Sequence, residues 1–111
     1  MIIKLELPDC GQQTVETVLK IIALLSDWAE RKRVAKYIEL IEMQLGGRDF
    51  ARDLHFTILV RSLVGNNFLQ RVTHTHRLRL GQVPDAEGCL RALQDKISGA
   101  LAEDKFKVRV G

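Results

Sequence analysis

The sequence predicts an α+β protein, a two-layer sandwich in which helices cover one face of an antiparallel four-stranded sheet. Three observations support this fold class. Four stretches alternate apolar and polar residues with the period of a strand, and three stretches repeat apolar residues with the period of a helix. The 111 residues are 46% hydrophobic, which suits one domain spanning residues 1–111 with its own core.

The first strand and the first helix follow directly from these two periods. Residues 1–7 alternate, with the apolar side at Ile3, Leu5 and Leu7, and predict a half-buried strand. Residues 12–25 predict a helix that is apolar on two sides. The sheet can cover only one of these sides, so a second helix or a partner chain is expected to cover the other.

Residues 28–45 predict a second helix. Asp27 followed by Glu30 is typical of a helix start, and a new apolar stripe at helical spacing follows. Gly46-Gly47 is expected to end this helix. No Gly or Pro separates it from the first helix, so one long kinked helix over residues 12–45 is the alternative.

The middle of the chain predicts a β-hairpin. Residues 54–64 and 68–80 both alternate, and Gly65-Asn66-Asn67 between them tolerates the positive φ angles of a tight turn. A three-residue loop pairs Ile58 with His74 and Phe56 with His76. This register keeps the apolar residues of both strands on one face.

The last part of the chain predicts a helix and a final strand. Asp85 is expected to cap a helix with an apolar stripe from Ala86 to Leu101, and residues 105–110 alternate like a strand. The predicted order is therefore β-α-α-β-β-α-β. Without the second helix this is the split βαβ topology of ferredoxin-like folds, in which the first and last strands are neighbours.

Positive charge is unevenly distributed, although the net charge is only +3. No Asp or Glu occurs between Asp53 and Asp85, a stretch that holds four arginines and all three histidines. If the apolar strand faces meet the helices, the opposite face is basic and rich in hydroxyl groups, with a single acid. The binding residues predicted on this face are Arg61, Arg71, Arg77, Arg79, Lys107 and Arg109.

The predicted function is a non-catalytic interaction module, a homodimer or a small subunit of a larger assembly, that docks partners through this basic face. Leu59 and Leu63 in the middle of the face favour a protein interface. The alternative is a nucleic-acid-binding protein that contacts phosphates through the same arginines. Outward strand positions carry no aromatic residue for base stacking, so such binding would be non-specific.

No sequence motif indicates an enzyme, a cofactor or a small-molecule substrate. His74 and His76 have a spacing that two metal ligands could use, but no third ligand lies nearby in the sequence, so no metal site is predicted. Cys10 and Cys89 are expected to be free thiols in a reducing compartment. No apolar segment reaches the length of a membrane span, and a cytoplasmic location is expected.

Overall fold

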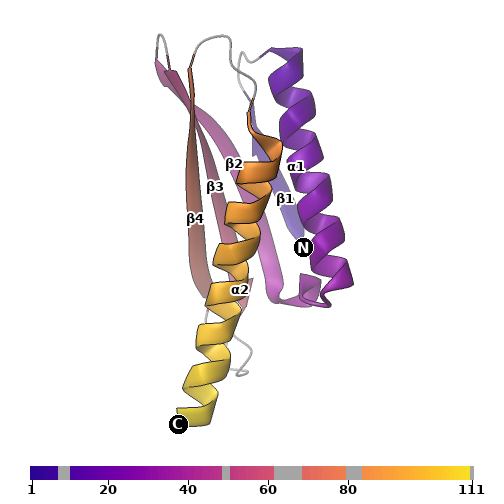
Figure 1. Ribbon diagram of the computed structural model, residues 1–111, viewed down its shortest axis with the longest axis vertical. Helices are drawn as coiled ribbons and strands as arrows, with labels where there is room; N and C mark the ends of the chain where they lie inside the picture. Colours follow the sequence, from indigo (N-terminus) through magenta and orange to yellow (C-terminus); the bar gives the residue numbers. More distant parts are fainter. Residues whose placement is uncertain (8–10, 49–50, 62–68, 80–83, 111) are drawn as a thin grey trace.

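A computed structural model describes the backbone of residues 1–7, 11–48, 51–61, 69–79 and 84–110, with side chains except at 47–48, 51–52, 79 and 102–110 (Figure 1). Both helices lie on one face of a four-stranded sheet, as predicted for an α+β fold. The elements in chain order are β1 (Ile2–Glu6), α1 (Gln12–Arg31), a short 3₁₀ helix (Ala35–Tyr37), β2 (Ile38–Arg48), β3 (Ala51–Arg61), β4 (Leu69–Arg79) and α2 (Ala86–Val110).

The strands lie in sequence order across the sheet, β1-β2-β3-β4. β1 is parallel to β2, and the two antiparallel pairs β2–β3 and β3–β4 follow. α1 is the crossover that joins the parallel pair, as a parallel connection requires. The sheet is therefore mixed, and the predicted antiparallel, ferredoxin-like arrangement with neighbouring first and last strands is wrong.

The predicted helix over residues 28–45 is also wrong, because this segment holds the end of α1, the short 3₁₀ helix and, from Ile38 onward, β2. Ile41, Met43 and Leu45 are buried at the period of a strand. An irregularity in the pairing between Ile38 and Leu40 places Ile38 on the same inner side as Ile41. The three-residue step between these two isoleucines resembles helical spacing, and this explains the misleading stripe.

α1 runs unbroken through Asp27, the predicted cap of a second helix, and ends at Arg31. Arg33 follows with φ of 58°, in the left-handed region. The amide of Val34 donates to the carbonyl of Ala29 at 2.9 Å, and that of Arg33 to the carbonyl of Glu30 at 3.1 Å. These two bonds form a Schellman motif, in which an arginine occupies the position that glycine usually takes.

The predicted strand over residues 105–110 is wrong as well, since α2 continues through Val110. The position beside β1, predicted for this final strand, is occupied by β2. The start of α2 agrees with the prediction: Asp85 accepts a hydrogen bond from the Gly88 amide through Oδ1 at 3.1 Å. The last turns of α2 extend beyond the sheet (Figure 1), in a molecule whose longest dimension is 49 Å.

The hairpin prediction is confirmed in its strands and faces but not in its register. Ile58 pairs with Val72 and Phe56 with His74, two residues away from the predicted partners. A shift of two keeps every side chain on the same face, so alternation alone cannot distinguish the two registers. The predicted turn residues lie outside the described part of the chain.

The core lies between the inner sheet face and the two helices. Its largest fully buried side chains come from α1, β2, β3 and α2, and include Phe56, Ile21, Leu25, Ile41, Met43, Leu93 and Ile97. Almost all of these residues are aliphatic, as the small aromatic content predicts. Among the described residues, no helix is long and apolar enough to cross a membrane.

Candidate functional site

The sheet face opposite the helices is one candidate site. β-strand alternation sends Phe56, Ile58 and Val60 of β3 into the core and turns His55, Thr57 and Leu59 toward the other side. The pairing of the strands arranges the outward residues in rows across the sheet. Successive rows are Ile2-Leu40-Leu59-Arg71, Lys4-Glu42-Thr57-Thr73, Glu6-Gln44-His55-Thr75 and Gly46-Asp53-Arg77.

One of these rows is apolar over three strands. Ile2 is 66% exposed, and Leu40 beside it and Leu59 next to Leu40 are partly exposed. Leu69 on β4 is 46% exposed, opposite Arg61 at the same end of the sheet. We call Ile2, Leu40, Leu59 and Leu69 the apolar band. Exposed apolar side chains that are contiguous and rimmed by polar groups are typical of protein contact surfaces.

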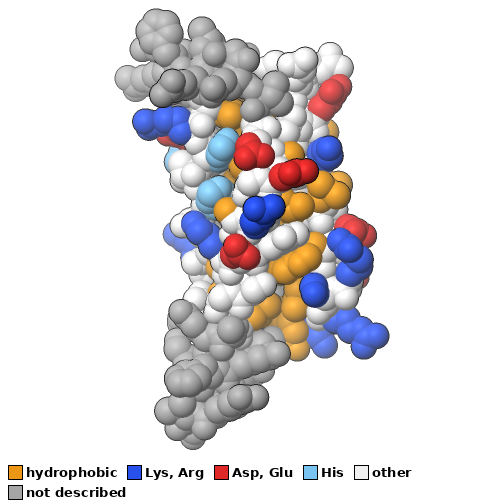
Figure 2. Space-filling view, in the orientation of Figure 1, with side chains coloured by type: hydrophobic (Ala, Val, Ile, Leu, Met, Phe, Trp, Pro, Cys, Tyr) orange, Lys and Arg blue, Asp and Glu red, His pale blue; other side chains and the backbone are white. Residues whose placement is uncertain are grey.

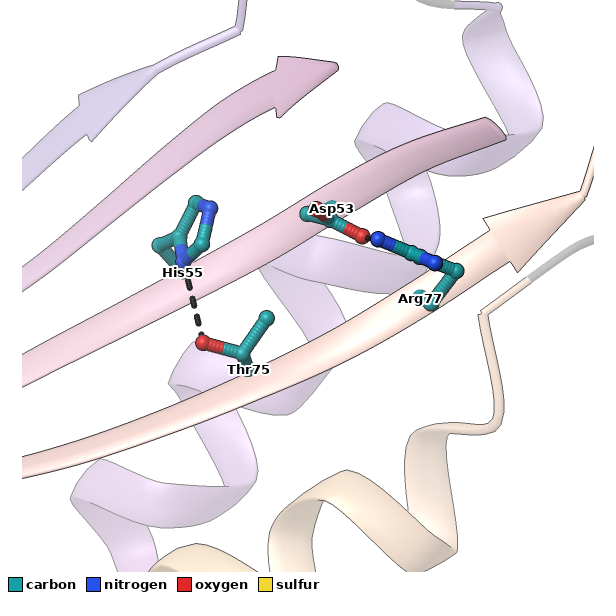
Figure 3. A network of polar contacts seen from close by, with 4 residues as sticks. All are labelled: Asp53, His55, Thr75 and Arg77. Atoms are coloured by element: carbon teal, nitrogen blue, oxygen red, sulfur yellow. Dashed lines mark hydrogen bonds and ion pairs between the residues drawn. The ribbon is translucent and has the colours of Figure 1, made fainter. Parts of the chain in front are cut away.

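The charge of the open face differs from the prediction of a basic surface with one acid. β2, predicted as a helix, instead brings Glu39 and Glu42 to the sheet. Arg61 forms an ion pair with Glu39, and Arg77 Nε donates to Asp53 Oδ1 at 3.1 Å (Figure 3). The described charged side chains of the face are the cations Lys4, Arg61, Arg71 and Arg77 and the carboxylates Glu6, Glu39, Glu42 and Asp53.

The Asp53–Arg77 pair lies next to a second polar contact. His55 Nδ1 and Thr75 Oγ1 form a hydrogen bond of 3.0 Å, and Figure 3 shows all four side chains on neighbouring strands β3 and β4. The hydrogen bond from Arg77, with the attraction of its charge, holds the pKa of Asp53 below its ordinary value of 3.8. The carboxylate is therefore ionised at neutral pH, and it neutralises one of the predicted binding arginines.

The six predicted binding residues do not form one surface. Arg61, Arg71 and Arg77 are exposed on the open face, and Arg79 lies at the end of β4 with its side chain outside the described part. Lys107 and Arg109 belong to the last turns of α2 rather than to a strand. Among the described side chains, Arg71 is the predicted binding arginine for which no ion pair is found.

A second candidate site lies on the helical side, between β4 and α2. His74 and His76 sit on the inner face of β4, and Cys89 is fully buried near the start of α2. One donor atom from each of the three side chains lies within 4.8 Å of the other two. His74 and His76 are partly exposed, so this cluster is accessible from one side, and Figure 2 shows histidine side chains at the surface on the helical side.

Burial controls the protonation of this cluster. Desolvation, with the nearby charges of Lys96 and His76, lowers the pKa of His74, so its imidazole is neutral at pH 7. Burial, with the negative charge of Asp85, raises the pKa of the Cys89 thiol to about 11. The thiol is therefore protonated at neutral pH and is a poor nucleophile on its own. His74 Nε2 is buried and has no hydrogen-bond partner.

The cluster is not visible in the sequence because Cys89 lies 13 positions after His76. The signal was present in two separate patterns. His74 and His76 occupy inner positions of a strand, and Cys89 belongs to the apolar stripe of the helix that follows that strand. A strand and the next helix of an α+β fold usually pack together, so these three inner positions could have been expected to meet.

An open groove of about 420 Å³ separates the end of α1 from the middle of α2. Figure 2 shows apolar side chains along the junction of the two helices. The lining mixes apolar, amide and charged groups and includes Trp28, Lys32, Val34, Gln94, Asp95, Ser98 and Leu101. Lys32 and Asp95, the charged residues of this lining, are both exposed to solvent.

Comparisons with known proteins give no further indication of function, because no family model, no curated protein and no solved structure matches this chain.

Proposed function

We propose that this protein is a non-catalytic interaction module that forms a homodimer, with the open sheet face of one protomer packed on that of its partner. The observation that carries the proposal is the apolar band, which crosses the sheet on the face that neither helix covers. Burial of Ile2, Leu40 and Leu59 against the same residues of a second copy would remove them from water, and such burial contributes about 25 cal/mol per Å².

Charge balance favours a second copy over other partners. A two-fold interface sets a surface against itself, so a uniformly basic face would repel its copy. This face carries four described cations and four described carboxylates, with Arg71 in the row of Leu59 and the others around the apolar band. Cations of one protomer can therefore face carboxylates of the other. An acidic partner or a nucleic acid would gain less from such a surface.

Size-exclusion chromatography with light scattering tests the dimer directly. The wild type should have twice the 12.6 kDa mass of one chain. Leu59→Lys places a charge in the centre of the apolar band and should convert the protein to a monomer without loss of the folded state. Leu19→Lys is the matched control, because Leu19 is also an exposed leucine, at 48%, but lies on α1.

Circular dichroism of both variants verifies that they are folded. A wild type that stays monomeric at the highest attainable concentration excludes the homodimer. A dimer that dissociates in Leu19→Lys but stays intact in Leu59→Lys would show that the interface lies on the helical side. This result would contradict an interface on the open sheet face.

The alternative of phosphate contact through the arginines has weaker support. Two of its three described arginines, Arg61 and Arg77, already pair with carboxylates, while Arg71 has no such partner. The test is binding of a mixed-sequence nucleic acid at two salt concentrations, for the wild type and for Arg71→Glu combined with Arg77→Glu. Binding that weakens with salt in the wild type and disappears in the double variant supports it. Equal binding by both proteins excludes it.

A further inference from the structure

We propose that His74, His76 and Cys89 form a binding site for a transition-metal ion, Zn²⁺ in particular, with three protein ligands and a fourth position open to solvent. The site is independent of the dimer interface, because His74 and His76 are on the inner face of β4 and Cys89 is on α2. Imidazole nitrogen and cysteine sulfur are the donors that zinc prefers. Two histidines from a strand and a cysteine from the following helix give three of the four ligands of a tetrahedral site.

The distances are close to those of a formed site. The three donor atoms lie within 4.8 Å of one another. Around tetrahedral zinc, with bonds of about 2.0–2.3 Å, neighbouring donors are separated by about 3.3–3.7 Å. A convergence of about 1 Å is therefore required. Rotation of the two imidazoles, which are only partly buried, can supply it without movement of the backbone.

The fold alone does not explain why histidines occupy these positions. The inner face of β4 carries Val72 and Leu78 on either side of His74 and His76, and both of these aliphatic residues are buried. An aliphatic residue at position 74 would suit this surface, whereas His74 Nε2 is buried without a hydrogen-bond partner. A bound ion would give this nitrogen the partner that the protein does not supply.

Surrounding groups hold the ligands and balance the charge. The ring of His74 stacks on Phe56, with centroids 6.3 Å apart and planes at 26°. Lys96 brings a positive charge near His74, which opposes a bound cation, and its ammonium donates to the Thr73 carbonyl oxygen at 2.6 Å. Asp85 places a negative charge close to Cys89. On binding, the Cys89 thiol releases its proton to solvent and the resulting thiolate joins the ion.

The fourth coordination position is expected to be open because the two histidine side chains are partly exposed to solvent. His74 and His76 are partly exposed, whereas Cys89 lies beneath them and is fully buried. An ion held by the three would therefore meet solvent on the histidine side, where a water molecule completes the tetrahedron. Structural zinc sites close all four positions with protein ligands, and sites with three protein ligands keep one for water or another ligand.

Titration with Co²⁺ tests the site, because four-coordinate cobalt gives visible absorption bands and a thiolate ligand adds a charge-transfer band in the near ultraviolet. The tag-free chain, kept reduced under anaerobic conditions, should bind one Co²⁺ per chain with both features, and Zn²⁺ should displace it. The melting temperature should rise with Zn²⁺ concentration, because the ion binds the folded chain and joins β4 to α2.

Three variants and two controls identify the ligands. Cys89→Ala should abolish the charge-transfer band, and His76→Gln should weaken Zn²⁺ binding by about 100-fold or more. His74→Leu should lose the ion as well, yet melt no lower than the wild type without metal, because it removes the unpartnered Nε2. Cys10→Ala and His55→Ala remove the other cysteine and the other histidine of the chain, and both should bind as the wild type does.

A wild type without the charge-transfer band, or a band that persists in Cys89→Ala and disappears in Cys10→Ala, overturns the site. Should Cys89→Ala fail to fold, His74→Leu and His76→Gln still decide, since normal cobalt binding by both would leave the two histidines without a role as ligands.

Discussion

Successive residues of β3 and β4 point alternately to the open sheet face and to the helical side. Alternation sends His55, Thr75 and Arg77 to the open face, and His74 and His76 to the helical side. This assignment was predictable from the sequence, because apolar residues alternate with polar ones along both strands and mark the inner face. The ion pair between Arg61 and Glu39 was not predictable, because Glu39 lies on β2, a strand whose sequence pattern predicts a helix.

The Asp53–Arg77 pair predicts a pH dependence of stability. The folded pKa of Asp53 is lowered from 3.8, so the pair stabilises the fold above that pH and the contribution disappears as the pH falls through the folded pKa. Wild type should therefore melt slightly above Asp53→Asn near pH 7, and the difference should vanish at about pH 2. The difference is small, because the Arg77 side chain is 73% exposed.

Thermal unfolding of Asp53→Asn, Arg77→Gln and the double variant at both pH values measures the pair. Arg77→Gln should show the same loss at neutral pH, and the double variant should add little to either. A difference that grows toward low pH would have the wrong sign for a lowered carboxyl pKa.

At the scale of elements, the end of α1 and the pairing of β2 account for most of the errors of sequence reasoning. Arg33 stands where glycine usually signals the end of a helix, so α1 ends without a visible mark. The irregular pairing near Leu40 gives a three-residue step that imitates helical spacing. Glu, Leu, Met and Gln in this segment are good helix formers, and tertiary pairing overrides that preference. α1, β3, β4 and the start of α2 were predictable because their periods are regular.

Arg33→Gly should stabilise the protein. A side chain in the left-handed region costs roughly 1–2 kcal/mol, and the greater freedom of glycine in the unfolded chain offsets part of the gain, which leaves about 0.5–1 kcal/mol. Urea unfolding measures the free energy. Arg33→Ala is the control, since it removes the same guanidinium but keeps a Cβ, and it should give no such gain. Equal stabilisation by both variants would show that loss of the guanidinium charge, and not the backbone conformation, causes the effect.

Ile41 and Leu40 test the assignment of β2. Ile41 is fully buried on the inner face, so Ile41→Ala should cost about 2–5 kcal/mol of unfolding free energy. Leu40→Ala, on the open face, should cost about 1 kcal/mol or less at protein concentrations where the chain is monomeric, and should weaken the dimer. Denaturant titration and light scattering measure the two effects. Equal losses of stability would be inconsistent with a strand that has one buried and one open face.

At the scale of the whole molecule, the layers were predictable and the topology was not. The amphipathic strands and helices require a sheet with helices on one side, which is what the structure has. Strand order depends on which strand lies beside β1, and periodicity carries no information on this choice. β2 takes that place and brings two glutamates with it, so the described side chains of the open face include as many carboxylates as cations, beside an apolar band. That balance is why we propose a second copy, rather than a phosphate backbone, as the partner of the open face.

Intermolecular NMR contacts test the central claim most directly. A mixture of isotope-labelled and unlabelled protein reports only contacts between methyl groups of different chains. The account predicts such contacts among Ile2, Leu40, Leu59 and Leu69, and none from Leu19 or Leu24 on α1. Contacts from the α1 leucines, with none from the apolar band, would contradict it.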